Sequence, residues 1–93
     1  MAEISLAEAL KQFLEQRKLQ GKVYALQIEE IWETLMGKTI AQYTSEIKIL
    51  GHTLFIITHI APLKQELLYQ KNLIIKRVNE ALGRDVIKDL IIQ

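Results

Sequence analysis

The feature that most constrains the fold is a change of hydrophobic period at Thr44. Before it, apolar residues recur every three to four positions, which is typical of amphipathic helices. After it, Ile47 and Ile49 alternate with charged residues, as in a strand with one face in water. A helical period returns after Pro62. Such a chain of 93 residues predicts one small α+β domain, over residues 1–93.

Two helices are expected before the change of period. Ser5 to Glu8 fits a capping box, and the apolar residues that follow at helical spacing predict a helix over about 6–17. Gly21 is interpreted as the break that ends the first helical region. A second helix is expected over about 23–36. It ends before a glycine, a residue that tolerates positive φ.

A β-hairpin is expected in the middle of the chain, with strands over about 44–50 and 52–58. A two-residue turn at Leu50 and Gly51 would place Ile47 opposite Leu54 on the core face. The second strand is apolar on both faces, unlike the first.

One long helix and a last strand complete the expected fold. Pro62 suits the first helical position, which predicts a helix over about 62–82 closed by Gly83. The last strand is expected over about 86–92. The order is α-α-β-β-α-β, a three-stranded sheet with helices packed on one face, in two layers.

Composition narrows the class of protein. The formal net charge is +1 and there is no cysteine, which removes disulfides and Cys-based zinc sites and suits a reducing compartment. Glu3 and Glu8 interrupt any signal-peptide pattern, and the apolar runs are far shorter than the ~20 residues of a membrane helix. A soluble cytoplasmic protein without a membrane segment is expected.

Several residues occur in an order that resembles a known family. They are Trp32, Gly37, Ile40, Ala41, Thr44, Gly51, Leu54, Ile56, Glu66, Leu67, Asn79, Leu82 and Gly83. This order resembles the DciA-like family of bacterial replicative-helicase loaders, over about residues 28–92. The resemblance implies a KH-like domain that contacts the replicative helicase and single-stranded DNA. Leu63 stands where the family often has an aromatic residue, and the chain looks like a short, single-domain version.

The sequence offers two candidate nucleic-acid contacts. KH domains hold the nucleic-acid backbone at a Gly-x-x-Gly loop. No two of the four glycines here lie three positions apart, so that clamp is not predicted. Basic residues cluster in two other places, where the alternative is a solvated helix face: Arg17, Lys18 and Lys22, and Lys71, Lys76 and Arg77.

The outer face of the sheet is the candidate contact with a protein partner. If the helices cover one face only, Phe55, Ile57, Ile87 and Ile91 are left on the open face. The alternative is that the first helix covers them. Self-association or docking of a partner is the hypothesis for this face.

Catalytic and metal chemistry find little support. His52 and His59 are expected at the surface without a shared metal. Three glutamates, Glu29, Glu30 and Glu33, are expected to form a solvent-exposed helix face rather than a catalytic acid–base pair. Trp32 is expected in the core rather than as a stacking platform, and Asn79 is expected to tie the end of the long helix. No enzyme activity, cofactor or metal is predicted.

These observations favour a non-enzymatic adaptor similar to the helicase loaders, with the replicative DNA helicase as partner and single-stranded DNA as a second ligand. One alternative is a general KH-like module that binds nucleic acid, including RNA. Another is a dimerisation module that acts only on protein. Trp32, Gly37, Ala41, Thr44, Gly51, Leu67, Asn79 and Gly83 are interpreted as structural residues that identify the domain.

Overall fold

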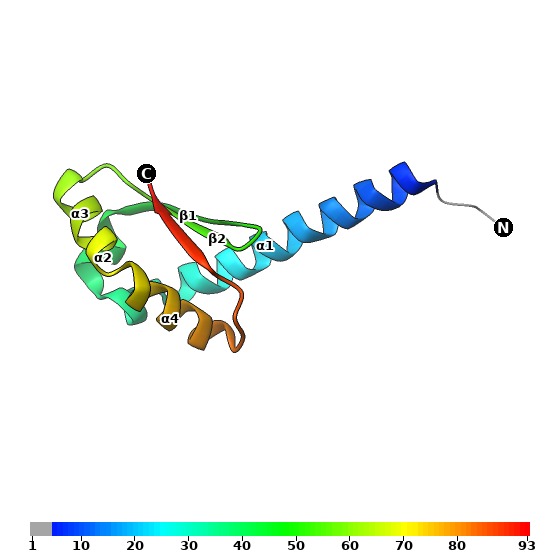
Figure 1. Cartoon of the computed structure of the whole chain (residues 1–93). Helices are drawn as coiled ribbons and strands as arrows, with labels where there is room; N and C mark the ends of the chain where they lie inside the picture. Colours follow the sequence, from blue (N-terminus) through cyan, green and yellow to red (C-terminus); the bar gives the residue numbers. More distant parts are fainter. Residues whose placement is uncertain (1–4) are drawn as a thin grey trace.

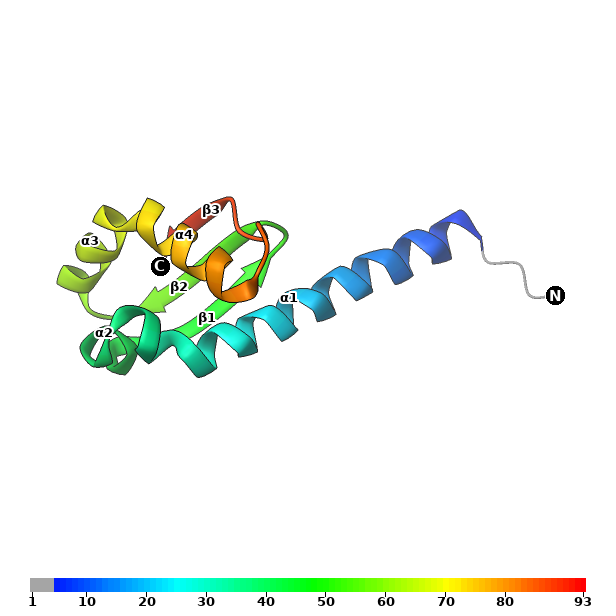
Figure 2. The same ribbon diagram turned by 90° about the horizontal axis from the view of Figure 1, so that it is seen from below.

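A computed structural model describes residues 5–93 of the chain. Glu3, one of the two residues that interrupt a signal-peptide pattern, lies outside the described residues. The elements follow the order α1 (Leu6–Met36), α2 (Lys38–Tyr43), β1 (Thr44–Leu50), β2 (Thr53–Thr58), α3 (Ala61–Tyr69), α4 (Lys71–Leu82) and β3 (Asp89–Ile92). The fold is α+β, with a three-stranded sheet of order β1-β2-β3. Helices α1 and α4 lie on one face of that sheet (Figures 1 and 2).

Helix α1 is one continuous helix of 31 residues, so the prediction of a break at Gly21 is wrong. The Ser5 hydroxyl accepts a hydrogen bond from the Glu8 backbone N–H and caps its start. Gly21 is buried inside the helix, where it faces the β1 backbone. A Cβ at this position would stand 2.5 Å from the carbonyl oxygen of Ile49. The glycine is therefore needed for close packing of helix on strand, not for a turn.

The hairpin between β1 and β2 has a different register from the one predicted. The turn consists of Gly51 and His52, so Ile47 lies opposite Ile56 and Ile49 opposite Leu54. Gly51 has φ +60, as the first position of a II′ turn requires. The error amounts to two residues of pairing, and an even shift leaves every side chain on its predicted face.

Two helices replace the single long helix that was predicted after the hairpin. Gln70 separates α3 from α4, with φ −94 and ψ 12. Its backbone N–H donates to the carbonyl oxygens of Glu66 and Leu67, and no glycine or proline marks the site. Leu67 on α3 and Ile74 on α4 are both fully buried, so each segment contributes to the core.

Strand β3 pairs in parallel with β2, which makes the sheet mixed. It begins at Asp89, three residues later than predicted, because other contacts hold the residues before it. Val86 and Ile87 are buried, and their backbone N–H groups bond to the Asn79 side chain. At the other end, the Gln93 N–H donates to the Ile56 carbonyl oxygen.

The core lies between the sheet and the helices α1, α3 and α4. Its largest fully buried apolar side chains come from the helices, the sheet and the loop before β3: Ile28, Leu54, Ile56, Leu67, Ile74, Ile87 and Val78. Trp32 is 3% exposed, which confirms its expected place in the core.

Candidate interaction surfaces

Four of the residues that carried the resemblance form structural contacts around the end of α1: Trp32, Gly37, Ile40 and Thr44. The Trp32 indole N–H donates to the Thr44 hydroxyl at 3.0 Å, and that hydroxyl donates to the Ile40 carbonyl oxygen at 2.7 Å. Gly37, with φ +92, lets the chain turn between α1 and α2. These groups join the first helix to the start of the sheet. Their hydrogen bonds and turn geometry give them a structural role.

Asn79 ties α4 to the loop that leads into β3. Its amide Nδ2 donates to the Ile87 carbonyl oxygen at 2.8 Å, and its Oδ1 accepts from the backbone N–H of Val86 and of Ile87. One side chain thus satisfies three backbone groups of a buried loop that has no strand partner for them. The role is structural, close to the one the sequence predicted.

The first part of α1, residues 6–16, projects beyond the sheet and is called the arm below (Figures 1 and 2). Every residue of the arm is exposed. Four large apolar side chains form a stripe along it, with exposed fractions of 87% for Leu6, 56% for Leu10, 53% for Phe13 and 51% for Leu14. An exposed apolar stripe of this extent on a small domain marks a contact surface.

The stripe on the arm continues the buried face of α1. Leu10 precedes the buried Ile28 by eighteen residues, and Leu14 precedes the buried Trp32 by the same number. Eighteen residues are five turns of about 3.6 residues, so each pair points in the same direction from the helix axis. The arm therefore presents a core-type face at a level where residues 5–93 supply no cover.

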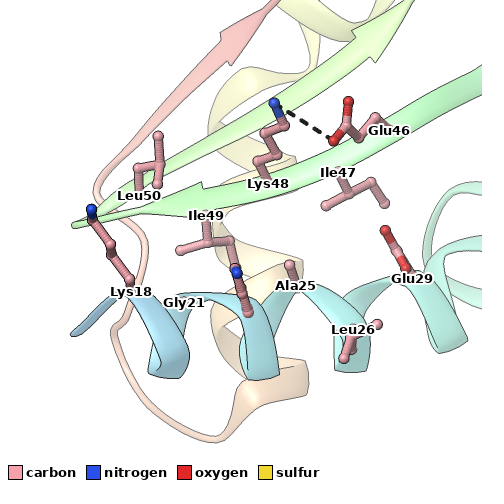
Figure 3. Close-up of a pocket in the computed structure, with 11 residues that line it drawn as sticks. Lys18, Gly21, Ala25, Leu26, Glu29, Glu46, Ile47, Lys48, Ile49 and Leu50 are labelled. Atoms are coloured by element: carbon pink, nitrogen blue, oxygen red, sulfur yellow. Dashed lines mark ion pairs between the residues drawn. The ribbon is translucent and has the colours of Figure 1, made fainter. Parts of the chain in front are cut away.

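A groove of about 390 Å³ lies between α1 and the outer edge of β1 (Figure 3). Strand β1 is an end strand of the sheet, and Ile47 and Ile49 point from it towards α1. Lys18 lies at one end of the groove beside Leu50, and Glu29 lies towards the other end. The lining residues are Lys18, Gly21, Lys22, Ala25, Leu26 and Glu29 from α1, and Glu46 to Leu50 from β1.

The two predicted basic clusters differ in how many of their side chains already have partners within the domain. On α1, Lys18 and Lys22 are one turn apart and both line the groove, while Arg17 points to another side, with its guanidinium 5.4 Å from the Phe13 ring centroid. On α4, Lys71 pairs with Asp89 at 2.7 Å and Arg77 donates to the Leu35 carbonyl oxygen. Two of the three predicted α4 cations thus already have partners within the domain.

A salt bridge between Lys71 and Asp89 joins α4 to β3. The hydrogen bond from Lys71 lowers the pKa of Asp89, and the Leu90 backbone N–H adds to the lowering. Both side chains are about half exposed, so water screens the pair.

A second, polar hollow of about 200 Å³ lies where the arm meets the hairpin turn. Arg17 and Arg84 both line it, and the Arg84 guanidinium approaches the Tyr24 hydroxyl at 3.5 Å. No sequence pattern joined Arg84 to the α1 cluster, since the two arginines are far apart along the chain. The pairing arises only when α4 packs beside α1.

The open face of the sheet carries three of the four predicted residues. Phe55 and Ile57 are partly exposed there, and Ile91, paired with Phe55, is 39% exposed. The expected place of Ile87 on this face is wrong, because Ile87 is 1% exposed and belongs to the core. It precedes β3 and is held inward by Asn79, so the alternation of a strand does not apply to it.

Within residues 5–93, no group of three or more His, Asp or Glu side chains is arranged to hold a metal ion. His52 and His59 are both exposed, and His52 Nδ1 lies 2.9 Å from the Val86 carbonyl oxygen. No helix of the described part of the chain is long and apolar enough to span a membrane. The main surface features of the described residues are the apolar stripe on the arm, the groove between α1 and β1, and the basic side chains beside them. Features of this kind are typical of binding surfaces.

The fold and these surfaces define a small α+β interaction domain. A family model described as "Dna[CI] antecedent, DciA" matches residues 5–92, and the chain belongs to the DciA family. The predicted resemblance is thereby confirmed. None of the curated proteins matches this chain. Membership supports a helicase-loader-like role in DNA replication for a non-catalytic adaptor.

Proposed function

We propose that the protein is a non-enzymatic adaptor that binds the replicative DNA helicase and holds single-stranded DNA beside it. The family match over nearly the whole chain is the observation that carries this proposal. Loading a ring-shaped helicase requires binding energy at a protein interface and no covalent step. The family association also makes the replicative helicase the natural partner to test first.

The groove between α1 and β1 is the surface that we assign to the helicase. Its apolar floor contains Ala25, Ile47 and Ile49, and Leu26 at its rim is 60% exposed. An edge strand beside a helix accepts an extended segment of a partner, with main-chain pairing for affinity and the floor for specificity. The open sheet face carries Phe55, Ile57 and Ile91, with the Glu46–Lys48 ion pair beside Phe55, and serves as the comparison surface in the test.

We assign the contact with single-stranded DNA to the basic side chains of Arg17, Lys18 and Lys22 on α1, together with Arg84. Of the two predicted clusters, this one keeps its side chains available. Arg17 and Arg84 line one hollow, and the two lysines line the neighbouring groove. Three or four cations on the strand would make the affinity fall with salt, with a log–log slope of about −2 to −3.

The helicase contact is tested by capture of purified replicative helicase from the same organism on the immobilised protein. Leu26→Ser should reduce capture at least tenfold, because it removes the apolar rim of the groove. Phe55→Ser serves as the matched variant and should leave capture near the wild-type level. If Phe55→Ser alone abolishes capture while the domain stays folded, the contact belongs to the sheet face. Absence of capture by the wild type would refute the helicase proposal.

The DNA contact is tested by fluorescence anisotropy with a labelled single strand at low salt. Lys18→Ala/Lys22→Ala should weaken binding and make the salt slope shallower by about one unit. Lys38→Ala/Lys88→Ala removes the same charge from exposed positions elsewhere and should change the affinity much less. Equal losses in both double variants would show a nonspecific charge effect instead.

A further inference from the structure

The wall that α1 contributes to the groove carries charges of opposite sign at its two ends. Along this wall come Lys18, Lys22, Leu26, Glu29 and Glu33, in that order. Their spacings of four, four, three and four residues keep all five on one side of the helix. Basic side chains therefore lie towards the hairpin end of the groove and acidic ones towards α2, with an apolar residue between them (Figure 3).

An acidic hollow of about 400 Å³ continues the groove at its acidic end. Glu29, Glu46 and Ile47 line both the groove and this hollow, so the two are contiguous. Glu30 and Glu33 add two more carboxylates to the lining of the hollow. The groove and the acidic hollow are together called the furrow below. The furrow is basic at one end, apolar in the middle and acidic at the other end.

The charges on the α1 wall of the furrow have no partners within the domain. Neither of the two ion pairs in residues 5–93 involves Lys18, Lys22, Glu29 or Glu33. All four side chains are exposed. A lysine and a glutamate pair along one helix when they are three or four residues apart, and here the nearest two are seven apart. Their separation leaves charges of both signs available to a ligand.

We propose that the helicase segment that enters the furrow is itself polarised, with acidic residues at one end, apolar residues in the middle and basic residues at the other end. Its acidic end lies beside Lys18 and Lys22, and its basic end lies beside Glu29 and Glu33. Opposite charges at the two ends fix the register of the bound segment, while its apolar centre covers Leu26. The inference rests on the proposed helicase contact and adds the chemistry and placement of the partner segment.

The rise of the helix sets the spacing of charges along the partner segment. Lys22 and Glu29 are seven residues apart, or about 10 Å along the helix axis. Lys18 and Glu33 are fifteen residues apart, or about 22 Å. An extended chain advances about 3.3 Å per residue. The inner charges of an extended segment are therefore about three residues apart and the outer ones about seven, so about eight residues fill the furrow.

The basic end of the furrow then serves two ligands, because the proposed DNA contact also uses Lys18 and Lys22. A single strand and the acidic end of the segment compete for these two lysines. Arg17 and Arg84 line the polar hollow outside the furrow and remain open to DNA. Such competition is reciprocal, so each ligand lowers the affinity for the other by the same factor.

Charge reversal at each end of the furrow tests the proposal with purified replicative helicase from the same organism. Lys22→Glu and Glu29→Lys should each lower capture by roughly three- to tenfold, because each places like charges together at one end. Lys38→Glu and Glu80→Lys make the same changes at exposed positions elsewhere and should leave capture near the wild-type level. If one furrow variant weakens capture and the other strengthens it, the partner carries a single sign of charge and the proposal is refuted. Unchanged capture by both variants refutes it as well, since the contact is then apolar only.

Two capped probe peptides test the furrow without the helicase. Both have two aspartates at one end, valines and serines between, and two arginines at the other end, but the aspartates come first in one peptide and last in the other. At low salt the wild type should prefer one order by roughly fivefold or more in anisotropy titrations. The variant Lys18→Glu/Lys22→Glu/Glu29→Lys/Glu33→Lys reverses the polarity at unchanged net charge and should prefer the other order. If the wild type does not distinguish the two peptides, or if the variant keeps the wild-type preference, the proposal is refuted.

The two measurements distinguish failure of this inference from failure of the proposed function. Helicase capture that both furrow variants leave unchanged keeps the adaptor role and removes the polarised segment. No capture of the helicase, together with a peptide preference that reverses in the fourfold variant, refutes the helicase as partner and leaves the furrow as the site of a polarised segment from another protein.

Discussion

Gly21→Ala offers the sharpest test of how the domain is packed. The new Cβ would lie 2.5 Å from the Ile49 carbonyl oxygen, roughly 0.9 Å short of the 3.4 Å at which ordinary contact begins. The obstructing atom belongs to the backbone of a paired strand, so no side chain can rotate away. Helix and strand must separate, and overpacking of this kind costs about 1–3 kcal/mol.

A second effect acts in the opposite direction. Alanine favours a helix interior over glycine by about 1 kcal/mol. Since the clash involves backbone on both sides, we expect the upper part of the overpacking range. The net loss should then be about 1–2 kcal/mol, which lowers the melting temperature of a domain this size by roughly 5–15 °C.

Thermal melting by circular dichroism, with urea unfolding beside it, measures this loss. Lys22→Ala is the matched control, because it places alanine one residue away at an exposed position of the same helix. The control should stay within about 0.5 kcal/mol of the wild type. If Gly21→Ala is instead more stable than the wild type, helix propensity dominates and the close approach of α1 to β1 is wrong.

Two further perturbations test other contacts. Asn79→Ala should lower the free energy of unfolding by about 2–3 kcal/mol, and urea unfolding measures it. The reason is that it leaves the Ile87 backbone N–H and carbonyl oxygen without partners and removes one of the two acceptors of the Val86 N–H. Asn72→Ala on the exposed side of α4 is its control, and equal effects would contradict the role of Asn79. Asp89→Asn tests the sign of the pKa shift. Because Lys71 lowers the pKa of folded Asp89, the wild type should be the more stable at neutral pH. That advantage should disappear as the pH falls through the lowered pKa, and a difference that persists in acid would contradict the assignment.

The sequence predicted the order of helices and strands well, because periodicity records which face of each segment is buried. The faces of β1 and β2 were predicted correctly although the register was wrong by two residues. Trp32 in the core was also predictable from its apolar neighbours. Each of these depends on the local pattern alone.

What the sequence did not predict depends on contacts between distant segments. In the sequence, a glycine that ends a helix looks the same as a glycine that lets a strand pack close to a helix. Only the position of Ile49 in the fold shows that Gly21 is of the second kind. The bend at Gln70 has no glycine or proline to mark it. Ile87 was placed on the open face because the strand was assumed to begin at Val86. The side chain of Asn79, seven and eight residues earlier, prevents that.

The candidate surfaces divide in the same way. The basic residues of α1 were visible in sequence, and the contribution of Arg84 was not, since it requires α4 to lie beside α1. The apolar stripe of the arm was visible as well. It was interpreted as the apolar face of a short helix, because nothing in the sequence shows that α1 extends past the end of the sheet.

The continuity of α1 has a mechanical consequence. Gly21 is locked against β1, and no hinge separates the arm from the rest of α1, which runs on to Met36 along the domain. The direction of the arm is therefore set when the domain folds, and little orientational freedom remains to be lost when a partner arrives. A load applied at the tip would act on the sheet through a rigid lever. Any partner bound to the arm would likewise be held at a fixed angle to whatever occupies the groove.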